Sequence, residues 1–199
     1  MRTNRQYKDK LPAGFTLIEL LVTIAIAAVL LLVAVPGMKD FFITNRLVTS
    51  TNDFIAALNT ARIEAIRRGA SVSLKKNSAT ANDWGSAGWT LFVDSDGDGT
   101  LDAGETTLKI GDALPTPITL YANNNFANYI TFKASGEANQ MGTFVFCYDG
   151  MLQEGGSPRS KAVVVIKTGR ARVAVDTDGD GIPNKDGSPS VNVASCTSP

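Results

Sequence analysis

The chain opens with a short polar segment followed by a long apolar run. Residues 15–35 read FTLIELLVTIAIAAVLLLVAV, and no charged residue occurs between Leu20 and Met38. An apolar run of this length is sufficient to cross a bilayer as one helix. Four of the five charged residues ahead of it are basic. We therefore expect a single pass through an inner membrane, with the N-terminus cytoplasmic and the later residues periplasmic.

A second pattern begins after Pro36. Apolar residues recur there at helical spacing up to Arg68, and Gly69 is a suitable helix C-cap. The segments 15–35 and 36–68 together predict one stem helix of about 80 Å at 1.5 Å per residue. Pro36 should interrupt this helix, because a proline removes one main-chain hydrogen bond and bends or locally melts a helix.

Residues 69–199 follow a third pattern. Short β-rich runs such as GWTLFV, TFVFCY and AVVVI are separated by Gly, Asn, Pro and Ser. Runs of this kind predict a head made mostly of antiparallel strands. The chain is therefore expected to have an α+β fold, with a long N-terminal helix packed on an antiparallel β-sheet head.

Composition narrows the classes of function. The chain has 19 basic and 19 acidic residues, so its net charge does not direct it toward nucleic acid as a whole. It has no histidine, which is the commonest general base, and no constellation of nucleophile and base is evident. We expect a protein that is not an enzyme and that requires no cofactor.

Two cysteines and one carboxylate need partners. Cys147 and Cys196 are the only cysteines and follow a membrane-insertion signal, which favours a disulfide; two buried free thiols are the alternative. Glu19 lies inside the apolar run, where a carboxylate costs roughly 2.5 to 3.5 kcal/mol on insertion scales at a helix centre. The Glu19 carboxylate therefore needs either a partner or a position from which it reaches the membrane interface.

The residues around Glu19 resemble a known processing signal. The sequence Gly14-Phe15-Thr16-Leu17-Ile18-Glu19 is similar to the prepilin peptidase site of type IV pilin-like proteins. The resemblance implies that residues 1–14 are a cytoplasmic leader, removed by cleavage after Gly14, and that the new N-terminal residue, Phe15, is methylated. It also implies that Glu19 meets the N-terminal amine of a neighbouring subunit, and that Pro36 is the helix-kinking proline of many pilins.

Three blocks of the chain resemble the GspH/FimT branch of these proteins, which includes FimT/FimU-type minor pilins. The first block lies at the predicted junction of stem and head, the second covers Trp84–Glu105, and the third is Thr168-Gly169-Arg170. The positions that match the first block are Ala61, Arg62, Glu64, Ala65, Arg68 and Val72. The resemblance implies a pilin-like form of the α+β fold.

For function, the resemblance implies a minor pilin that is incorporated into a type IV pilus and helps to initiate its assembly. Its partners would be other pilins and minor pilins, the prepilin peptidase, and the inner membrane before assembly. Its final location would be the pilus at the cell surface. The alternative is a GspH-type pseudopilin of a type II secretion system, in which the same parts build a short periplasmic piston.

Two acidic loops suggest calcium binding. Residues 94–105 match the twelve-position EF-hand loop, with oxygen ligands expected from Asp94, Asp96, Asp98, Thr100, Asp102 and Glu105. A strand rather than a helix leads into this loop, so a polar β-turn is the alternative. Residues 176–184 resemble thrombospondin-type calcium repeats, but Gly187 stands at position twelve. A solvated loop rich in Asp and Gly is the alternative there.

A basic segment of the chain suggests DNA binding. Gly169-Arg170-Ala171-Arg172 matches the G-R-x-R motif of FimT-type proteins that act in DNA uptake. If the strand AVVVIKTGRARVAV is continuous, Arg170 and Arg172 share one face, and two guanidinium groups can bind adjacent phosphates. The alternative is a solvated β-turn edge protected by charge, beside acidic residues that oppose DNA unless calcium neutralises them. The candidate DNA-binding residues are Lys161, Lys167, Arg170 and Arg172.

Overall fold

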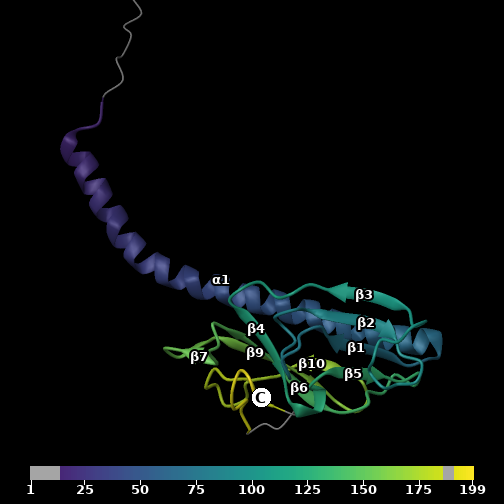
Figure 1. Ribbon diagram of the computed structural model, residues 1–199. Coiled ribbons are helices and arrows are strands. Elements are labelled where there is room, and N and C mark those ends of the chain that lie inside the picture. Colours follow the sequence, from purple (N-terminus) through teal and green to yellow (C-terminus); the bar gives the residue numbers. More distant parts are fainter. Residues whose placement is uncertain (1–13, 186–190) are drawn as a thin grey trace, which may run out of the picture. The chain divides into compact units, whose positions relative to one another are not determined.

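The computed structural model describes residues 14–185 and 191–199, without the side chains of residues 33, 35 and 36 (Figure 1). The predicted leader lies outside these residues except for Gly14. The predicted kink lies at Pro36, whose side chain also lies outside them. Both remain predictions.

The stem is one helix, α1 (Leu17–Arg68). It begins two residues later than the sequence suggested, because Thr16 caps it. The backbone N–H of Glu19 donates to the hydroxyl oxygen of Thr16 at 3.3 Å, which satisfies one of the unpaired N–H groups of the first turn.

The C-terminal end of α1 lies where the sequence predicted it. Gly69 has a φ of +64°, a left-handed conformation that favours glycine. The N–H of Ala70 donates to the carbonyl oxygen of Ala65, and the N–H of Gly69 to that of Ile66, each at 3.3 Å. These two bonds form a Schellman motif, which ends the helix.

The chain divides into two compact units, one extending to Asp40 and the other, here called the head unit, comprising Phe41–Pro199. In the first unit the apolar side chains of α1 are exposed, as in Phe15 at 84% and Leu32 at 77%. Among the described residues no single helix is by itself long and apolar enough to span a membrane. The stretches Leu17–Leu32 and Gly37–Arg68 meet that test only as a pair.

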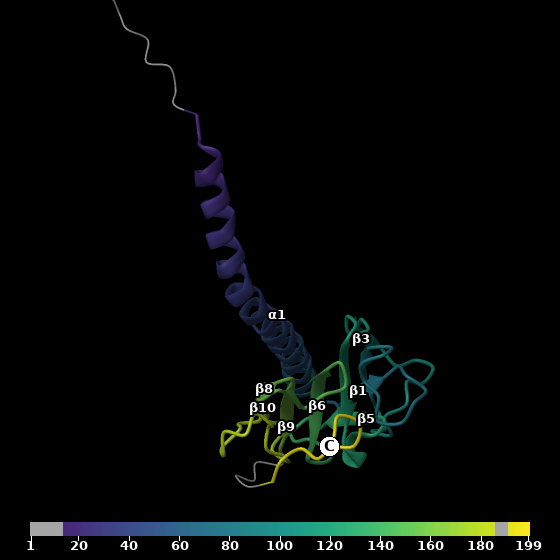
Figure 2. The same ribbon diagram turned by 90° about the vertical axis from the view of Figure 1, so that its left-hand side faces the viewer.

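The head unit contains two four-stranded sheets in which all strand pairs are antiparallel (Figures 1 and 2). The first sheet has the order β3 (Thr107–Gly111), β2 (Trp89–Val93), β1 (Val72–Lys76) and β5 (Tyr129–Phe132). The second has the order β10 (Ala171–Val173), β9 (Ser160–Val165), β6 (Gly142–Tyr148) and β4 (Ile118–Ala122). A small hairpin of β7 (Gln153–Glu154) and β8 (Ser157–Pro158) and the 3-10 helix η1 (Asn124–Phe126) complete the elements. The α+β prediction is confirmed.

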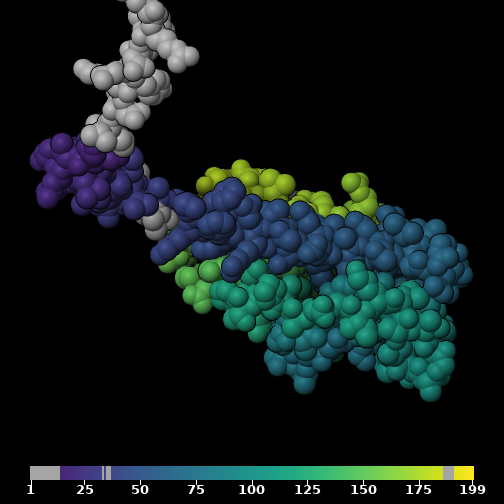
Figure 3. Space-filling model, turned by 90° about the horizontal axis from the view of Figure 1, so that it is seen from above, coloured from purple at the N-terminus to yellow at the C-terminus, as the bar shows by residue number. Residues whose placement is uncertain are grey.

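One hydrophobic core joins α1 to both sheets. Alternate residues of each strand face it, including Leu74 of β1, Leu91 of β2, Phe144 of β6 and Val163 of β9. Phe54 of α1 lies at its centre, with its ring 4.8 Å from that of Phe144. The other side of this part of α1 is uncovered in Figure 3, and Ile63 is 61% exposed there.

A second, smaller core lies on the opposite face of the second sheet. Val145 and Cys147 of β6 pack there with Val193 and Cys196 of the C-terminal segment. Cys147 and Cys196 form a disulfide, which confirms the predicted pairing. The disulfide therefore attaches the end of the chain to the sheet.

Candidate functional site

The predicted processing site lies directly before α1. A β-carbon placed on Gly14 would meet no atom within 4 Å, and Phe15 is 84% exposed. Glu19 lies in the first turn of α1 and is exposed. Among the described residues, no group of the chain bonds to its carboxylate. Within the part of the chain that the structure describes, Gly14, Phe15 and the Glu19 carboxylate are therefore exposed.

The first acidic loop is anchored at Asp94, which is fully buried. The Asp94 carboxylate accepts hydrogen bonds from the N–H of Gly97 at 2.8 Å, from the N–H of Gly99 at 3.0 Å, and from the hydroxyl of Ser73. The Ser73 hydroxyl also lies 2.6 Å from that of Thr131. Asp94 is therefore a structural anchor as well as a candidate ligand.

This loop lies over the outer face of the first sheet. Gly99 packs against the ring of Tyr129, because a β-carbon at position 99 would come within 2.3 Å of that ring. Phe92, Ser73 and Thr131 share this face and are buried, although they are not part of the core that includes α1. The loop therefore shields them from solvent.

The structure brings three of the six expected calcium ligands together. Carboxylate oxygens of Asp94, Asp96 and Asp98 lie within 4.8 Å of one another. Glu105 instead accepts the N–H of Ser95 at 2.7 Å and that of Asp102 at 3.1 Å. Thr100 donates its N–H to Asp98 at 2.6 Å, and its side chain is exposed. The three clustered carboxylates are hard oxygen donors that suit Ca²⁺, but the six-ligand set is not assembled.

Charge crowding in this loop is visible at Asp102. Partial loss of solvent raises the pKa of this carboxyl, and the like charges of Asp98, Asp96, Glu105 and Asp94 raise it further. A bound cation would relieve this repulsion. The carboxylates therefore fit a divalent ion electrostatically.

The second acidic loop repeats the geometry of the first. Asp176 accepts the N–H groups of Gly179 and Gly181, each at 2.8 Å, as Asp94 accepts those of Gly97 and Gly99. The Asp176, Asp178 and Asp180 carboxylates also lie within 4.8 Å of one another. The D-x-D-G-D-G sequence thus forms the same turn twice, and the second turn is the more exposed.

The basic segment is a hairpin, so the condition that its strand is continuous is not met. β9 ends at Val165, a turn occupies residues 166–170, and β10 begins at Ala171. Formation of the turn is favoured by Gly169, which has a φ of +78°. The four candidate DNA-binding residues therefore do not lie along one strand.

Strand register separates these four residues. Arg172 pairs with Val164 and so lies on the sheet face of the smaller core. Lys161 is two residues from Val163 in the same strand and so lies on the opposite face, toward α1. Lys167 and Arg170 lie together in the turn, where the Lys167 ammonium group donates to the carbonyl oxygen of Asn139.

Basic residues that were not considered in this role lie close to that turn. Arg62 donates from Nε to the carbonyl oxygen of Gly136 at 2.9 Å, and Gly136 also lies against Gly169. Arg67 and Arg68 follow on the last turn of α1. In the sequence, Arg62 and Arg68 were identified only as positions that match the first GspH/FimT block.

The long N-terminal helix, the antiparallel head and the exposed Gly14–Phe15 site together define a pilin-like protein. The profile of the family described as Type II transport protein GspH matches residues 50–169, and that of the prokaryotic N-terminal methylation motif matches residues 10–35. The GspH match covers more than half of the chain. The chain therefore belongs to the GspH family, as its three sequence blocks suggested.

Known proteins agree with this assignment. Pilin-like protein PilA1 of Thermus thermophilus is 29% identical, with 80% of this chain and 97% of that protein covered. A crystal structure of the type IV minor pilin FimU of Pseudomonas aeruginosa matches with a TM-score of 0.54 at 21% identity, covering 78% of this chain and 98% of that one. A second crystal form of FimU gives a TM-score of 0.51 at 20% identity, covering 75% and 99%. The two crystal structures support the fold.

Proposed function

We propose that this chain is a minor pilin that is incorporated into a type IV pilus and helps to initiate its assembly. The observation that carries the proposal is the start of α1. Gly14 and Phe15 are exposed directly before the helix, and Glu19 presents an exposed carboxylate one turn into it. Cleavage after Gly14 by the prepilin peptidase would create a charged amine at Phe15, and the Glu19 carboxylate of one subunit would pair with the amine of another.

Incorporation into a filament would also account for the exposed apolar surface of the first unit. Side chains such as Leu17, Leu21 and Leu32 are more than half exposed in the single chain. They would lie in the inner membrane before assembly and against other subunits afterwards, with the head unit in the periplasm and then on the pilus. The names of PilA1 and FimU, a pilin-like protein and a minor pilin, support this reading.

A pseudopilin of a type II secretion system is the second candidate. The matching family is itself described as a type II transport protein. The two functions use the same parts and differ in where the filament ends. A gene neighbourhood with other minor pilin and pilus-tip genes would favour the pilus, and a general secretion operon would favour the pseudopilin.

DNA binding and calcium binding stay predictions of the sequence. The structure does not favour the four-residue DNA site, since Lys161 and Arg172 lie on opposite faces of a sheet. Calcium is supported by the clustering of Asp94, Asp96 and Asp98 and by the matching cluster in the second loop.

Filament incorporation of the tagged full chain tests the proposed function. We expect the mature protein in the fraction sheared from the cell surface. We expect Gly14→Ala to accumulate as precursor, and Glu19→Val to be cleaved but missing from the filament fraction. Glu137→Val, a change at an exposed glutamate of the head unit, is the control and should behave as wild type. Normal incorporation of Glu19→Val would contradict the proposal, and loss of protein secretion with an empty surface fraction would favour the pseudopilin.

A further inference from the structure

A cavity of about 520 Å³ lies beside β4, an edge strand of the second sheet. The N–H of Trp84 donates to the carbonyl oxygen of Leu120 at 2.9 Å, which holds the loop 83–86 along β4. The N–H of Asp149 donates to the carbonyl oxygen of Pro117 at 3.0 Å, which holds the turn after β6 beside the loop that leads into β4. These segments form the walls of the cavity, and its volume is sufficient for a small organic group.

The lining of the cavity combines an apolar part with two carboxylates. Leu114, Pro117 and Ile118 supply the apolar part, and Asp83 and Asp149 supply the carboxylates. No basic side chain lines the cavity in the described part of the chain. Carboxylates that line a cleft with walls of low dielectric constant concentrate a negative potential inside it.

Asp83 carries the buried charge of this lining, since only 7% of the residue is exposed. Its Oδ1 accepts the N–H groups of Gly85 at 3.0 Å and Ser86 at 3.1 Å, and its Oδ2 accepts the hydroxyl groups of Ser78 and Ser86. Burial raises the pKa of the carboxyl, but these bonds outweigh burial and hold the pKa below its ordinary value. The Lys76 ammonium group donates to the carbonyl oxygen of Ser78 at 2.6 Å and does not pair with Asp83. Asp83 is therefore an ionised carboxylate at neutral pH.

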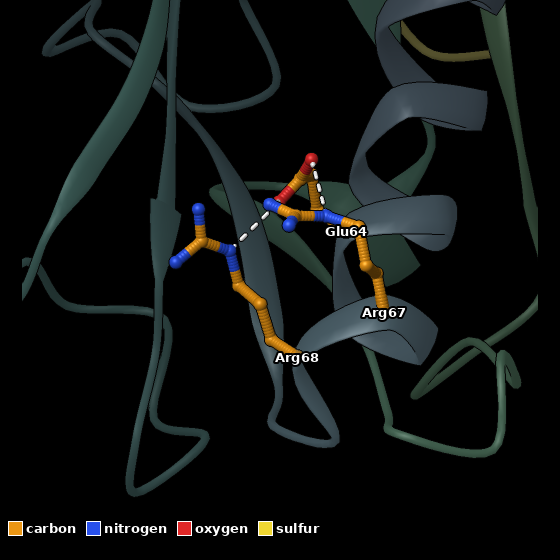
Figure 4. A network of polar contacts seen from close by, with 3 residues as sticks. All are labelled: Glu64, Arg67 and Arg68. Carbon is orange, nitrogen blue, oxygen red and sulfur yellow. Dashed lines mark hydrogen bonds and ion pairs between the residues drawn. The ribbon is translucent and has the colours of Figure 1, made fainter.

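No cation of the chain balances the two carboxylates of the cavity. Among the described residues, neither Asp83 nor Asp149 forms an ion pair. Elsewhere in the head unit the carboxylate of Glu64 is paired with Arg67 and Arg68, each at 2.7 Å (Figure 4). Because an unpaired charge is costly where solvent is partly excluded, the cavity favours a positively charged occupant.

We propose that this cavity receives a lysine or arginine side chain of a different pilin in the same filament. The aliphatic stem of that side chain would lie on Leu114, Pro117 and Ile118, and its cationic head would bond to the exposed carboxylate of Asp149. Asp83 would attract the head through its charge. The inference rests on the proposed function, because it takes the partner to be another filament subunit.

Other classes of ligand suit the lining less well. Each carboxylate oxygen of Asp83 already accepts two hydrogen bonds, whereas Ca²⁺ needs about six to eight oxygen ligands. A neutral sugar would leave both charges unbalanced, and DNA would be repelled by them. A cation on an aliphatic stem uses the apolar part of the lining as well as its charge.

Ligand-observed NMR tests the chemistry of the cavity, with full-length protein purified from membranes in detergent. The probe is N-acetyl-arginine methylamide, and its neutral isostere, N-acetyl-citrulline methylamide, is the control ligand. We expect saturation transfer from the protein to the aliphatic protons of the arginine probe. The citrulline compound should bind about tenfold more weakly, because it lacks the charge that the two carboxylates favour.

Asp149→Asn identifies the carboxylate that bonds to the probe. Asp149 has a φ of +55°, a left-handed conformation that asparagine also adopts, so the change removes the charge and keeps the turn. We expect about tenfold weaker binding of the arginine probe and an unchanged unfolding temperature. Asp112→Asn, at an exposed carboxylate that does not line the cavity, is the matched control and should bind the probe as wild type does. Equal binding of the two compounds, or equal affinity of Asp149→Asn and wild type, would overturn the inference.

Photo-cross-linking in the producing cell tests the source of the cation. A tagged full-length chain carries Thr116→p-benzoylphenylalanine, at an exposed residue of the cavity lining. We expect a cross-linked peptide from another protein with an N-terminal methylation motif. Replacing the lysine or arginine of that peptide by glutamine should lower the yield as much as Asp149→Asn does. The two changes together should lower it no further, as for two groups that act through one contact.

The remaining outcomes overturn the inference. A cross-link only to another copy of this chain, or a yield that neither charge change alters, would exclude the proposed contact. Binding of the arginine probe without a cross-link to a pilin would assign the cavity to a free organic cation instead. Protein that reaches the sheared filaments without cross-linking would refute this inference alone, whereas protein absent from them would refute the proposed function.

Discussion

The backbone of Gly169 lies so close to Gly136 that a β-carbon at position 169 would come within 2.0 Å of the Gly136 carbonyl oxygen. Arg62 bonds to the same oxygen at 2.9 Å. The contact joins the β9–β10 turn to the turn after β5 and to α1. Gly169 is therefore needed for packing, whatever the neighbouring arginines bind.

We predict that Gly169→Ala destabilises the head unit by about 3 kcal/mol, through a left-handed backbone cost of roughly 1 to 2 kcal/mol and an added clash. Gly150→Ala is the matched control, because Gly150 has a φ of +69° but no atom within 4 Å of a β-carbon. Gly150→Ala should lower the free energy of unfolding only by the cost of the left-handed backbone. Denaturant unfolding of both purified variants measures the difference, and equal losses would show that the contact with Gly136 is not tight.

The disulfide should stabilise one end of the chain. Cys147 and Cys196 are 49 residues apart, and closing a loop of that length is worth about 4 kcal/mol in the chain-entropy model. We expect Cys147→Ser with Cys196→Ser to lower the free energy of unfolding by about 2 to 5 kcal/mol. Hydrogen exchange should increase first in residues 174–185 and 191–199, while β1 and β2 stay protected. Uniform loss of protection across both sheets would contradict this local role.

The C-terminal end of α1 and the strand β3 illustrate how much of the fold local sequence could predict. Gly69, at the end of the apolar helical pattern, was sufficient to place the end of the helix, because a Schellman motif depends on a few adjacent residues. β3 was not predicted, since its sequence, TLKIG, alternates weakly and lies at an exposed sheet edge. A strand of this kind is specified by its pairing with β2, which sequence periodicity does not reveal.

The candidate DNA-binding residues show the same limit of prediction from local sequence. Lys161, Lys167, Arg170 and Arg172 are close in sequence, but a turn and the strand register separate them. Arg62 and Gly169 belong to two blocks far apart in the sequence, and the fold brings them to one carbonyl oxygen. The acidic loops were easier to predict, since a short D-x-D-G-D-G turn is formed by its own hydrogen bonds.

Calcium should stabilise the folded protein if the acidic loops bind it, because a ligand that binds only the folded state stabilises that state, by about 2.7 kcal/mol at a hundred times its Kd. We expect millimolar calcium, added after chelation, to raise the unfolding temperature. Asp96→Asn with Asp98→Asn should remove the contribution of the first loop, and Asp178→Asn that of the second. Asp112→Asn, at an exposed carboxylate outside both loops, is the control. An unchanged unfolding temperature in wild type would exclude calcium binding in this range.

Asp83 should contribute stability that depends on pH. Burial raises the pKa of its carboxyl, but hydrogen bonds from Ser86, Ser78 and Gly85 outweigh burial and leave the pKa below the ordinary value of 3.8. The N–H of Gly85 donates to it at 3.0 Å and the Ser78 hydroxyl at 3.1 Å. Because the pKa is lowered on folding, the stabilisation is complete above the ordinary range of aspartate and is lost as pH falls through the folded-state pKa.

Asp83→Asn tests this. We expect the variant to be less stable than wild type by about 1 to 3 kcal/mol at neutral pH, the usual cost of impairing a buried charged hydrogen-bond network. The difference should shrink as the pH falls below about 4. Asp112→Asn should show no such convergence. A stability difference that stays constant down to pH 2 would show that the Asp83 charge is not what stabilises the turn.

If the chain is a filament subunit that is processed at the start of α1, its mature N-terminus is the new amine of Phe15. Mass spectrometry of the full-length gene product, purified from membranes of the producing organism, should show a chain that begins at Phe15 with one methyl group on its amine. The unprocessed form should accumulate in Gly14→Ala. A mature chain that begins at Met1, or one cut after the apolar run at residue 35 or beyond, would exclude processing after Gly14.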